Sequence, residues 1–115
     1  MSNIDVKRTA KLFIGGAFPR SESGRVYEIK GANKKFLANP ALASRKDLRD
    51  AVVASKSAQS GWANATAFNR GQILYRIAEI MQGRSEQFVE EICALEGITT
   101  KAAKLQVVEA IDTWV

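Results

Sequence analysis

The apolar residues in the C-terminal part of the chain recur with the period of an α-helix. In residues 66–81 they fall on one face of a helix with about 3.6 residues per turn. These residues are Ile73, Leu74, Ile77, Ala78 and Met81. The same periodicity marks neighbouring segments, and the pattern predicts helices near residues 45–60, 67–82, 85–96 and 100–115. The middle two are either separate or joined through Gly83 as one bent rod.

Capping residues predict where these helices begin. Thr66 can accept a first-turn backbone N–H, and Ser44 with Asp47 has the hydroxyl-to-acid spacing of a capping box. Ser85 is expected to cap the third helix.

Glycines predict where the first three helices end. Gly61, Gly83 and Gly97 each follow the last periodic residue, where a left-handed residue is favoured. The fourth helix is expected to start at Thr99 or Thr100.

The predicted shared core combines the apolar faces of all four helices. It comprises Leu48, Val52, Leu74, Ile77, Met81, Phe88, Ile92, Leu105, Val108 and Ile111.

The N-terminal part shows short apolar runs separated by turn signals instead of a helical period. Residues 1–10 are polar and are expected to form a flexible arm. In residues 11–40 the turn signals are Gly15-Gly16, Ser21 to Gly24, Gly31 to Lys35 and Asn39-Pro40. They predict two or three antiparallel strands in β-hairpins. The fold class is therefore α+β: antiparallel β-hairpins followed by three or four amphipathic helices in a helical region over residues 44–115.

Composition indicates a folded chain and excludes several functions. Of the 115 residues 46% are hydrophobic and 25% charged, which is ordinary for a globular protein. The absence of histidine removes the commonest general base and zinc ligand, so self-contained hydrolase or metal chemistry is not expected. No metal site is predicted.

Charge and hydropathy set expectations for location and partners. The net charge of +5 would permit contact with nucleic acid or an anionic membrane, but the basic residues are scattered among acids. A solvated basic surface is the favoured interpretation, and neither nucleic acid nor membrane is expected as a partner. Because no apolar run approaches the roughly 20 residues of a membrane span and no signal peptide is evident, a cytoplasmic location is expected.

Two side chains have both a structural and a functional interpretation. Cys93, the only cysteine, lies in an apolar stripe beside several glutamates, which favours a buried structural thiol over a reactive one. Trp62, beyond the predicted end of the first helix, is either a ligand platform or a packing anchor, and the anchor is favoured.

The last helix ends without a glycine, a basic last turn or a proline. Asp112 to Val115 leave two bulky apolar residues at an uncapped terminus. We therefore expect the helical region to be incomplete at its C-terminus.

Ordered sequence blocks from about Lys11 to Val115 resemble the N-terminal portion of an aldehyde dehydrogenase. The blocks are Leu12-Phe-Ile-Gly-Gly-Ala-Phe18, Ser23-Gly24, Asp47-Leu-Arg-Asp-Ala-Val-Val-Ala54, Gly61-Trp62, Asn69-Arg-Gly-Gln-Ile-Leu-Tyr-Arg-Ile-Ala-Glu79 and Ala110-Ile-Asp-Thr-Trp114. In that superfamily the corresponding region forms β-hairpins and long helices that pack against the dinucleotide-binding domain. The resemblance thus implies that residues 44–115 are the first part of a cofactor-binding domain.

The resemblance also implies which parts of the enzyme have no counterpart here. Such enzymes oxidise an aldehyde to a carboxylic acid with a catalytic cysteine, a glutamate and NAD or NADP. These residues and the glycine-containing cofactor turn lie downstream in the family, and Cys93 does not match the nucleophile. No catalytic or cofactor-binding residue is therefore assigned, and no cofactor is expected to bind this segment alone. One departure is Glu96-Gly-Ile-Thr-Thr100, where many members have an acidic, glycine-containing turn that ends in lysine.

Three functions are compared. The favoured one is the N-terminal structural segment of an NAD(P)-dependent aldehyde dehydrogenase, catalytically incompetent alone, whose partner is the rest of that chain or another copy of itself. The alternative is a stand-alone helical interaction module that uses its apolar helix faces. A basic nucleic-acid binder is third, because no nucleic-acid-binding motif accompanies the charge.

Overall fold

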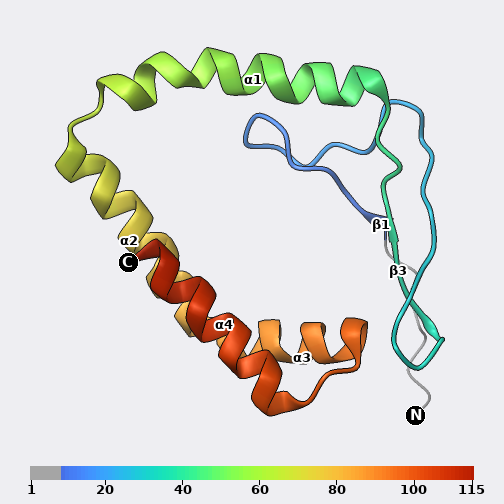
Figure 1. Cartoon of the computed structure of the whole chain (residues 1–115). Coiled ribbons are helices and arrows are strands. Elements are labelled where there is room, and N and C mark those ends of the chain that lie inside the picture. Colours follow the sequence, from blue (N-terminus) through green and yellow to red (C-terminus); the bar gives the residue numbers. More distant parts are fainter. Residues whose placement is uncertain (1–8) are drawn as a thin grey trace, which may run out of the picture. The chain divides into compact units, whose positions relative to one another are not determined.

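The computed structural model describes residues 9–115, which form three short strands followed by four helices (Figure 1). The chain divides into two compact units. The N-terminal unit holds the described residues up to Lys30 together with Lys35–Ser60, and the C-terminal unit holds Gly31–Lys34 and Gly61–Val115. Within the described part, this is a small α+β segment with a mixed sheet.

The sheet has the order β1-β3-β2, with β3 in the centre. Strand β2 (Ile29–Lys30) pairs antiparallel with β3 (Phe36–Pro40), as predicted for a hairpin. Strand β1 (Thr9–Ala10) pairs parallel with β3, so the expectation of antiparallel hairpins alone was wrong. A parallel pair needs a long connection, and residues 11–35 provide it.

The predicted boundary of the N-terminal arm also needs correction. Thr9 and Ala10, which the sequence placed in that arm, form β1 because β3 offers them a partner at Asn39 and Pro40. Residues 1–8 of the predicted arm lie outside the described residues.

Of two predicted turn signals, the Gly15-Gly16 turn is confirmed and Pro40 is not a turn. Gly15 and Gly16 both have positive φ, as a tight two-residue hairpin turn requires, and Ile14 and Ala17 exchange backbone hydrogen bonds of 3.0 and 3.1 Å across it. Pro40, by contrast, does not break the pattern. It is the last residue of β3, where its missing N–H is tolerated, and its carbonyl accepts a hydrogen bond from the Tyr27 N–H at 3.1 Å.

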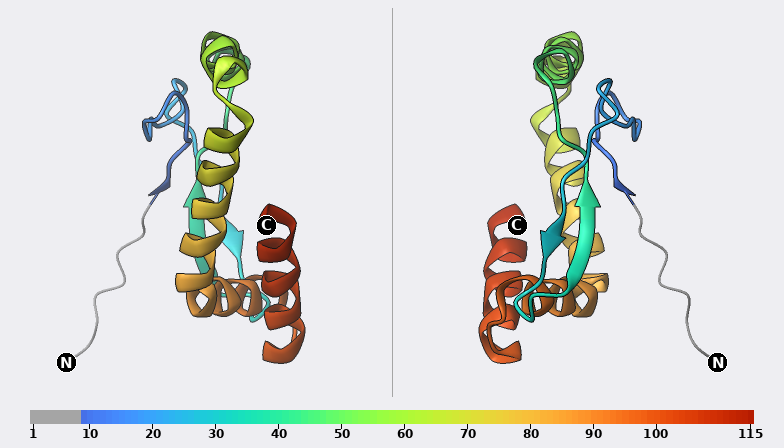
Figure 2. Two further views of the ribbon diagram at one scale, coloured as in Figure 1. Left: turned by 90° about the vertical axis from the view of Figure 1, so that its left-hand side faces the viewer. Right: turned by 90° about the vertical axis from the view of Figure 1, so that its right-hand side faces the viewer.

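The four predicted helices are present. They are α1 (Arg45–Asn64), α2 (Ala67–Gly83), α3 (Ser85–Glu96) and α4 (Thr100–Trp114). Figure 2 shows α3 turning away from the axis of α2 and leading to α4. None of the helices in the described part is long and apolar enough to cross a membrane.

The predicted cap of α2, the predicted start of α4 and the predicted glycine after α3 are confirmed. The hydroxyl of Thr66 accepts the N–H of Asn69 at 3.1 Å, and that of Thr99 accepts the N–H of Ala102 at 3.1 Å. Gly97 follows α3 in the left-handed region with φ 70°, and its N–H bonds to the carbonyl of Cys93 at 2.9 Å.

One predicted helix end and two predicted capping roles were wrong, whereas the predicted ranges of α2, α3 and α4 agree with the structure to within one residue. Gly61 does not end α1, which continues to Asn64 because the Arg70 guanidinium binds its last carbonyls, including that of Ala63 at 3.0 Å. Gly83 is the last residue of α2 and has no positive φ. Only Arg84 separates α2 from α3, and Ser85, the first residue of α3, is not its cap.

The core of the C-terminal unit is small and lies between α3 and α4. Val89, Ala103 and Val107 are buried there. Partly buried apolar residues pack against them, namely Ile92, Cys93, Ile98 and Ile111.

None of the ten predicted core residues is fully buried. Leu74, Ile77, Met81, Ile92 and Ile111 are half-buried, whereas the other five are exposed, namely Leu48, Val52, Phe88, Leu105 and Val108. The reason is that α1 and α4 each have more than one apolar or small face. Helix α4 buries the face with Ala103, Val107 and Ile111, and α1 turns the small residues Ala51 and Ala54 inward.

Candidate interaction surfaces on the helices

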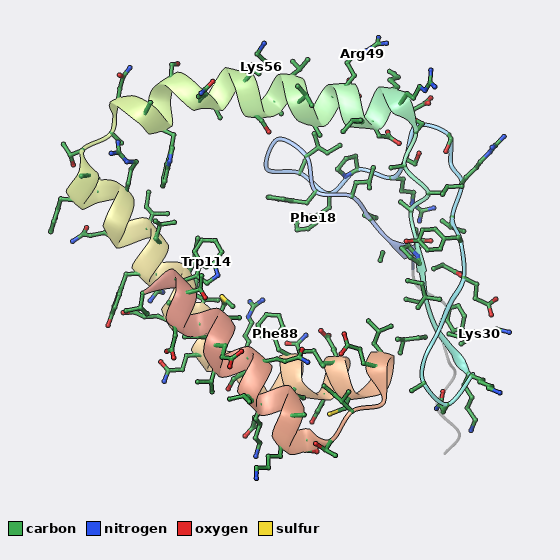
Figure 3. All side chains as sticks on the ribbon, in the orientation of Figure 1. Phe18, Lys30, Arg49, Lys56, Phe88 and Trp114 are labelled. Atoms are coloured by element: carbon green, nitrogen blue, oxygen red, sulfur yellow. The ribbon has the colours of Figure 1, made fainter. Side chains whose placement is uncertain are left out.

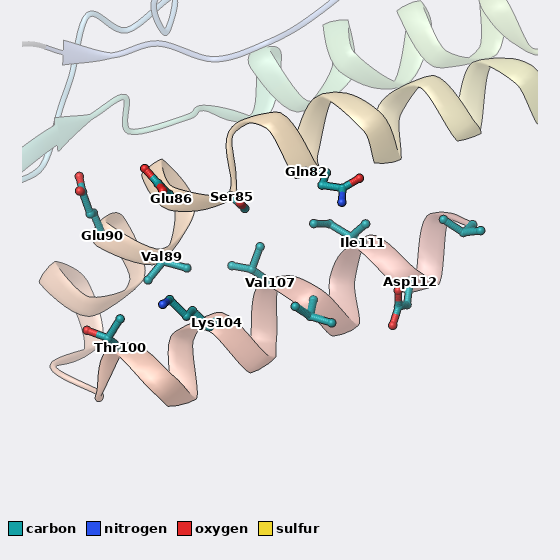
Figure 4. Close-up of a pocket in the computed structure, with 12 residues that line it drawn as sticks. Gln82, Ser85, Glu86, Val89, Glu90, Thr100, Lys104, Val107, Ile111 and Asp112 are labelled. Carbon is teal, nitrogen blue, oxygen red and sulfur yellow. The ribbon is translucent and has the colours of Figure 1, made fainter.

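A groove of about 720 Å³ runs along α3 and α4 within the C-terminal unit (Figure 4). Val89 of α3 and Val107 of α4, both buried, contribute to its apolar lining, and the half-buried Ile111 extends this lining along α4. Val107 and Ile111 are four residues apart, so they project from one face of the helix. Val108 and Val115 add exposed apolar surface on the α4 side. The result is an open groove with apolar walls.

The charged residues that line this groove are mainly acidic. Glu86 and Glu90 come from successive turns of α3, and Asp112 comes from α4. Lys104 is the basic side chain of the lining, and it extends from α4 on the side that faces α3 (Figure 4). Helix α3 as a whole carries four glutamates and no lysine or arginine. The groove is therefore suited to a partner surface that is both apolar and basic.

Helix α1 in the N-terminal unit carries a surface of the opposite charge. Leu48 and Val52 are exposed one turn apart, and Arg45, Arg49 and Lys56 follow the same side at helical spacing. Figure 3 shows Arg49 and Lys56 extending from the same side of α1. We call these five residues the basic stripe.

A buried hydrogen-bonded carboxylate, Asp47, holds the start of α1 against the preceding turn. Its carboxylate accepts the Ser21 hydroxyl at 2.6 Å, the Ser44 N–H at 2.8 Å and the Glu22 N–H at 3.1 Å. The hydroxyl of Ser44 in turn accepts the N–H of Asp47 at 3.3 Å, which completes the predicted capping box.

These bonds favour the ionised carboxylate. The Ser21 hydroxyl is the largest cause, followed by the backbone N–H groups of Ser44 and Glu22, and together they lower the pKa of Asp47 to about 2. The cluster is structural, because Ser21 and Glu22 join the turn to the first residues of α1 and Ser44 caps the helix.

Cys93 lies where the structural interpretation places it. Its side chain is half-buried and packs against the cluster of Val89, Ala103 and Val107. Trp62 lies inside α1 instead of beyond its end, and 43% of its surface is exposed. It is therefore not the buried anchor that the sequence predicted, because α1 continues past Gly61 and carries Trp62 within its own last turn.

The described residues offer no metal site. Within residues 9–115 no group of three or more histidine, cysteine, aspartate or glutamate side chains is arranged to hold a metal ion. The expectation that this segment has no catalytic or cofactor-binding residue stays a prediction.

Comparison with models of known protein families finds a match over most of the chain. The family model described as "Aldehyde dehydrogenase family" matches residues 18–115. The chain belongs to the aldehyde dehydrogenase family. The resemblance stated from the sequence blocks is thereby confirmed.

The curated relatives of this aldehyde dehydrogenase family chain are much longer proteins. It is 35% identical over 120 residues to cytosolic 10-formyltetrahydrofolate dehydrogenase of Pongo abelii, covering 94% of this chain and 13% of that protein. It is 34% identical over 105 residues to the protein of the same name from Xenopus tropicalis, covering 89% of this chain and 11% of that protein. The chain thus spans a little over a tenth of the length of these curated relatives.

Solved structures share the fold of the segment. An NAD-dependent benzaldehyde dehydrogenase from Corynebacterium glutamicum matches with a TM-score of 0.86 and 30% identity, covering 91% of this chain and 23% of that one. HpcC from Thermus thermophilus matches with a TM-score of 0.90 and 26% identity, covering 93% of this chain and 21% of that one. The strands and helices described above therefore correspond to part of the aldehyde dehydrogenase fold.

Sequence reasoning about this aldehyde dehydrogenase segment missed both charged surfaces. The signal for the groove was present as Glu86 and Glu90, four residues apart in a helix without basic residues. The stripe was missed because Leu48 and Val52 were assigned to the core.

Proposed function

We propose that this chain is the N-terminal structural segment of an NAD(P)-dependent aldehyde dehydrogenase and does not catalyse aldehyde oxidation by itself. The observation that supports the proposal is that the chain corresponds to only a small part of a complete aldehyde dehydrogenase. The family match extends over residues 18–115, yet the same fold makes up only 23% of the solved benzaldehyde dehydrogenase chain. In the complete enzyme the activity would be oxidation of an aldehyde to a carboxylic acid with NAD or NADP, and the NAD-dependent relative favours NAD.

The partner that we propose for this role is the rest of an aldehyde dehydrogenase chain. Helix α2 supports this, because it leaves large apolar side chains exposed on its surface, namely Phe68, Ile73, Tyr75 and Ile80. Exposed apolar area of this kind favours association, at roughly 25 cal/mol per Å² buried. A cytoplasmic location is part of the same proposal, supported by a relative whose name describes it as cytosolic.

Activity measurements test the catalytic part of the proposal. The purified chain is incubated with benzaldehyde and either NAD or NADP, and NADH or NADPH formation is followed by absorbance. We expect the rate of the protein-free buffer, because the segment has no residues matching the family's nucleophile or cofactor turn. A rate above buffer that is lost in the Cys93→Ala variant would overturn the proposal and make Cys93 the nucleophile.

The alternative is a stand-alone helical interaction module, and the exposed apolar faces of α1, α2 and α4 are the observation that favours it. Sequencing the genomic DNA after the Val115 codon separates the two. An open reading frame that continues into a βαβ pattern supports the enzyme segment, and a stop codon supports the module.

A further inference from the structure

We propose that two copies of this chain associate by placing the basic stripe on α1 of one copy in the acidic groove along α3 and α4 of the other. This inference is independent of the proposed function, because it concerns the chain's own two surfaces and requires no catalysis.

The first argument is that the charges of the groove and the basic stripe are complementary. The groove presents Glu86, Glu90 and Asp112 around apolar walls, with Lys104 as its basic member. The stripe presents only positive charge, from Arg45, Arg49 and Lys56. Opposite potentials of this kind steer two surfaces together and set their orientation.

The basic side chains are available for such a contact. The structure gives Arg45, Arg49 and Lys56 no ion-pair partner among the described residues, and all three are exposed. At about 3.6 residues per turn, Asp47 lies on the opposite side of α1 from Arg45 and Arg49. It is buried there, and its carboxylate accepts the Ser21 hydroxyl and two backbone N–H groups instead of pairing with the stripe.

The second argument is that both the stripe and the groove offer apolar side chains to the contact. Leu48 is 66% exposed and lies on the stripe together with Val52. In the groove, Val107 and Ile111 provide apolar walls, and Val108 is an exposed apolar neighbour. Covering Leu48 and Val52 with these walls removes apolar surface from water on both sides of the contact.

The two surfaces also match in length. The stripe from Arg45 to Lys56 extends about 16 Å along its helix, at about 1.5 Å per residue. The α4 side of the groove, from Thr100 to Val115, extends about 22 Å by the same measure. The whole stripe therefore fits along the groove.

Each copy carries both surfaces, and in the proposed pair the contact forms twice. Copy one places its stripe in the groove of copy two and receives the stripe of copy two in its own groove. Such a reciprocal exchange closes a dimer, whereas a one-way contact would build longer chains. An acidic groove would repel nucleic acid. The stripe of a second copy combines exposed apolar and basic side chains, which is the combination that the groove is suited to bind.

Charge reversal in two variants tests the proposal. Variant A carries Glu86→Lys and Glu90→Lys, so that its groove and stripe are both basic. Variant B carries Arg45→Glu and Arg49→Glu, so that both are acidic. We expect the unmodified chain to dimerise at micromolar concentration in size-exclusion chromatography with light scattering, and each variant alone to dimerise at least about tenfold more weakly.

The mixture of the two variants is the decisive sample. The basic groove of A matches the acidic stripe of B, and the acidic groove of B matches the basic stripe of A. An equimolar mixture should therefore form the heterodimer that neither variant forms with itself, and added salt should weaken it.

A matched control changes the same charge on the same helix outside the groove. Glu91→Lys with Glu96→Lys leaves the groove lining intact and should dimerise like the unmodified chain. Circular dichroism checks that every variant keeps its helices. The proposal is overturned if the unmodified chain is a monomer, if A and B dimerise as well as it does, or if their mixture stays monomeric.

Discussion

Asp47 shows how a single side chain can define the start of a helix. One carboxylate binds the Ser21 hydroxyl and the N–H groups of Glu22 and Ser44, and therefore joins a turn more than twenty residues away to the beginning of α1. The local half of this arrangement, Ser44 with Asp47, was predictable because it depends only on a three-residue spacing. The contact with Ser21 was not, because no short-range pattern specifies it.

The first prediction concerns the pH dependence that Asp47 confers. Its pKa in the native state is about 2, below the value of about 4 expected in the unfolded chain. The stabilisation is therefore fully present above about pH 4 and is lost as the pH falls toward 2. Asp47→Asn should lower the thermal unfolding temperature at neutral pH and flatten its decline in this acidic range.

Thermal unfolding followed by circular dichroism between neutral pH and pH 2 measures both effects. Asp50→Asn is the matched control, since Asp50 is an exposed carboxylate on the same helix, and it should keep the profile of the unmodified chain. An Asp47→Asn variant with an unchanged profile would show that the hydrogen-bonded carboxylate contributes no stability.

At the scale of elements, periodicity predicted where helices form better than which side of each is buried. All four helices were found, because a sustained helical period depends on local sequence. Helix α4 nevertheless buries Val107, and Leu105, which was predicted to be in the core, is exposed. A helix with apolar residues on several faces does not itself specify which face meets its neighbour.

The second prediction tests that assignment. Val107 is 5% exposed and belongs to the core between α3 and α4, whereas Leu105 is 60% exposed. Val107→Ala should lower the free energy of unfolding by about 2 kcal/mol through lost burial and the cavity it leaves. Leu105→Ala should change it by less than about 0.5 kcal/mol.

Urea denaturation followed by circular dichroism measures both values under one condition. If Leu105→Ala lowers the free energy of unfolding more than Val107→Ala does, Leu105 lies on the buried face of α4. The face predicted from the sequence would then be correct, and the face buried in the structure would be wrong.

For the whole molecule, the family was predictable and the surfaces were not. Ordered blocks such as Asn69 to Glu79 indicated the family, and the match over residues 18–115 confirms it. Which apolar residues remain exposed depends on how much of the fold the chain contains. This segment makes up only 21% of the solved HpcC chain that it resembles. If this chain continues into the rest of that fold, as proposed above, further contacts there would cover some of the apolar side chains that are exposed in this segment.

The third prediction follows from that exposed apolar surface. Trp114 is exposed on the last turn of α4 next to Val115, which is more exposed still. Replacing Trp114 with lysine removes apolar surface and adds one positive charge, so the variant should stay in solution at a higher concentration. Ala110→Lys, at an exposed position on the same helix, adds the same charge without removing a large apolar group. Light scattering over a concentration series at fixed salt should therefore show the onset of aggregation last for Trp114→Lys. Equal onsets for the two variants would mean that charge alone governs solubility, and an earlier onset for Trp114→Lys would mean that the indole supports the fold.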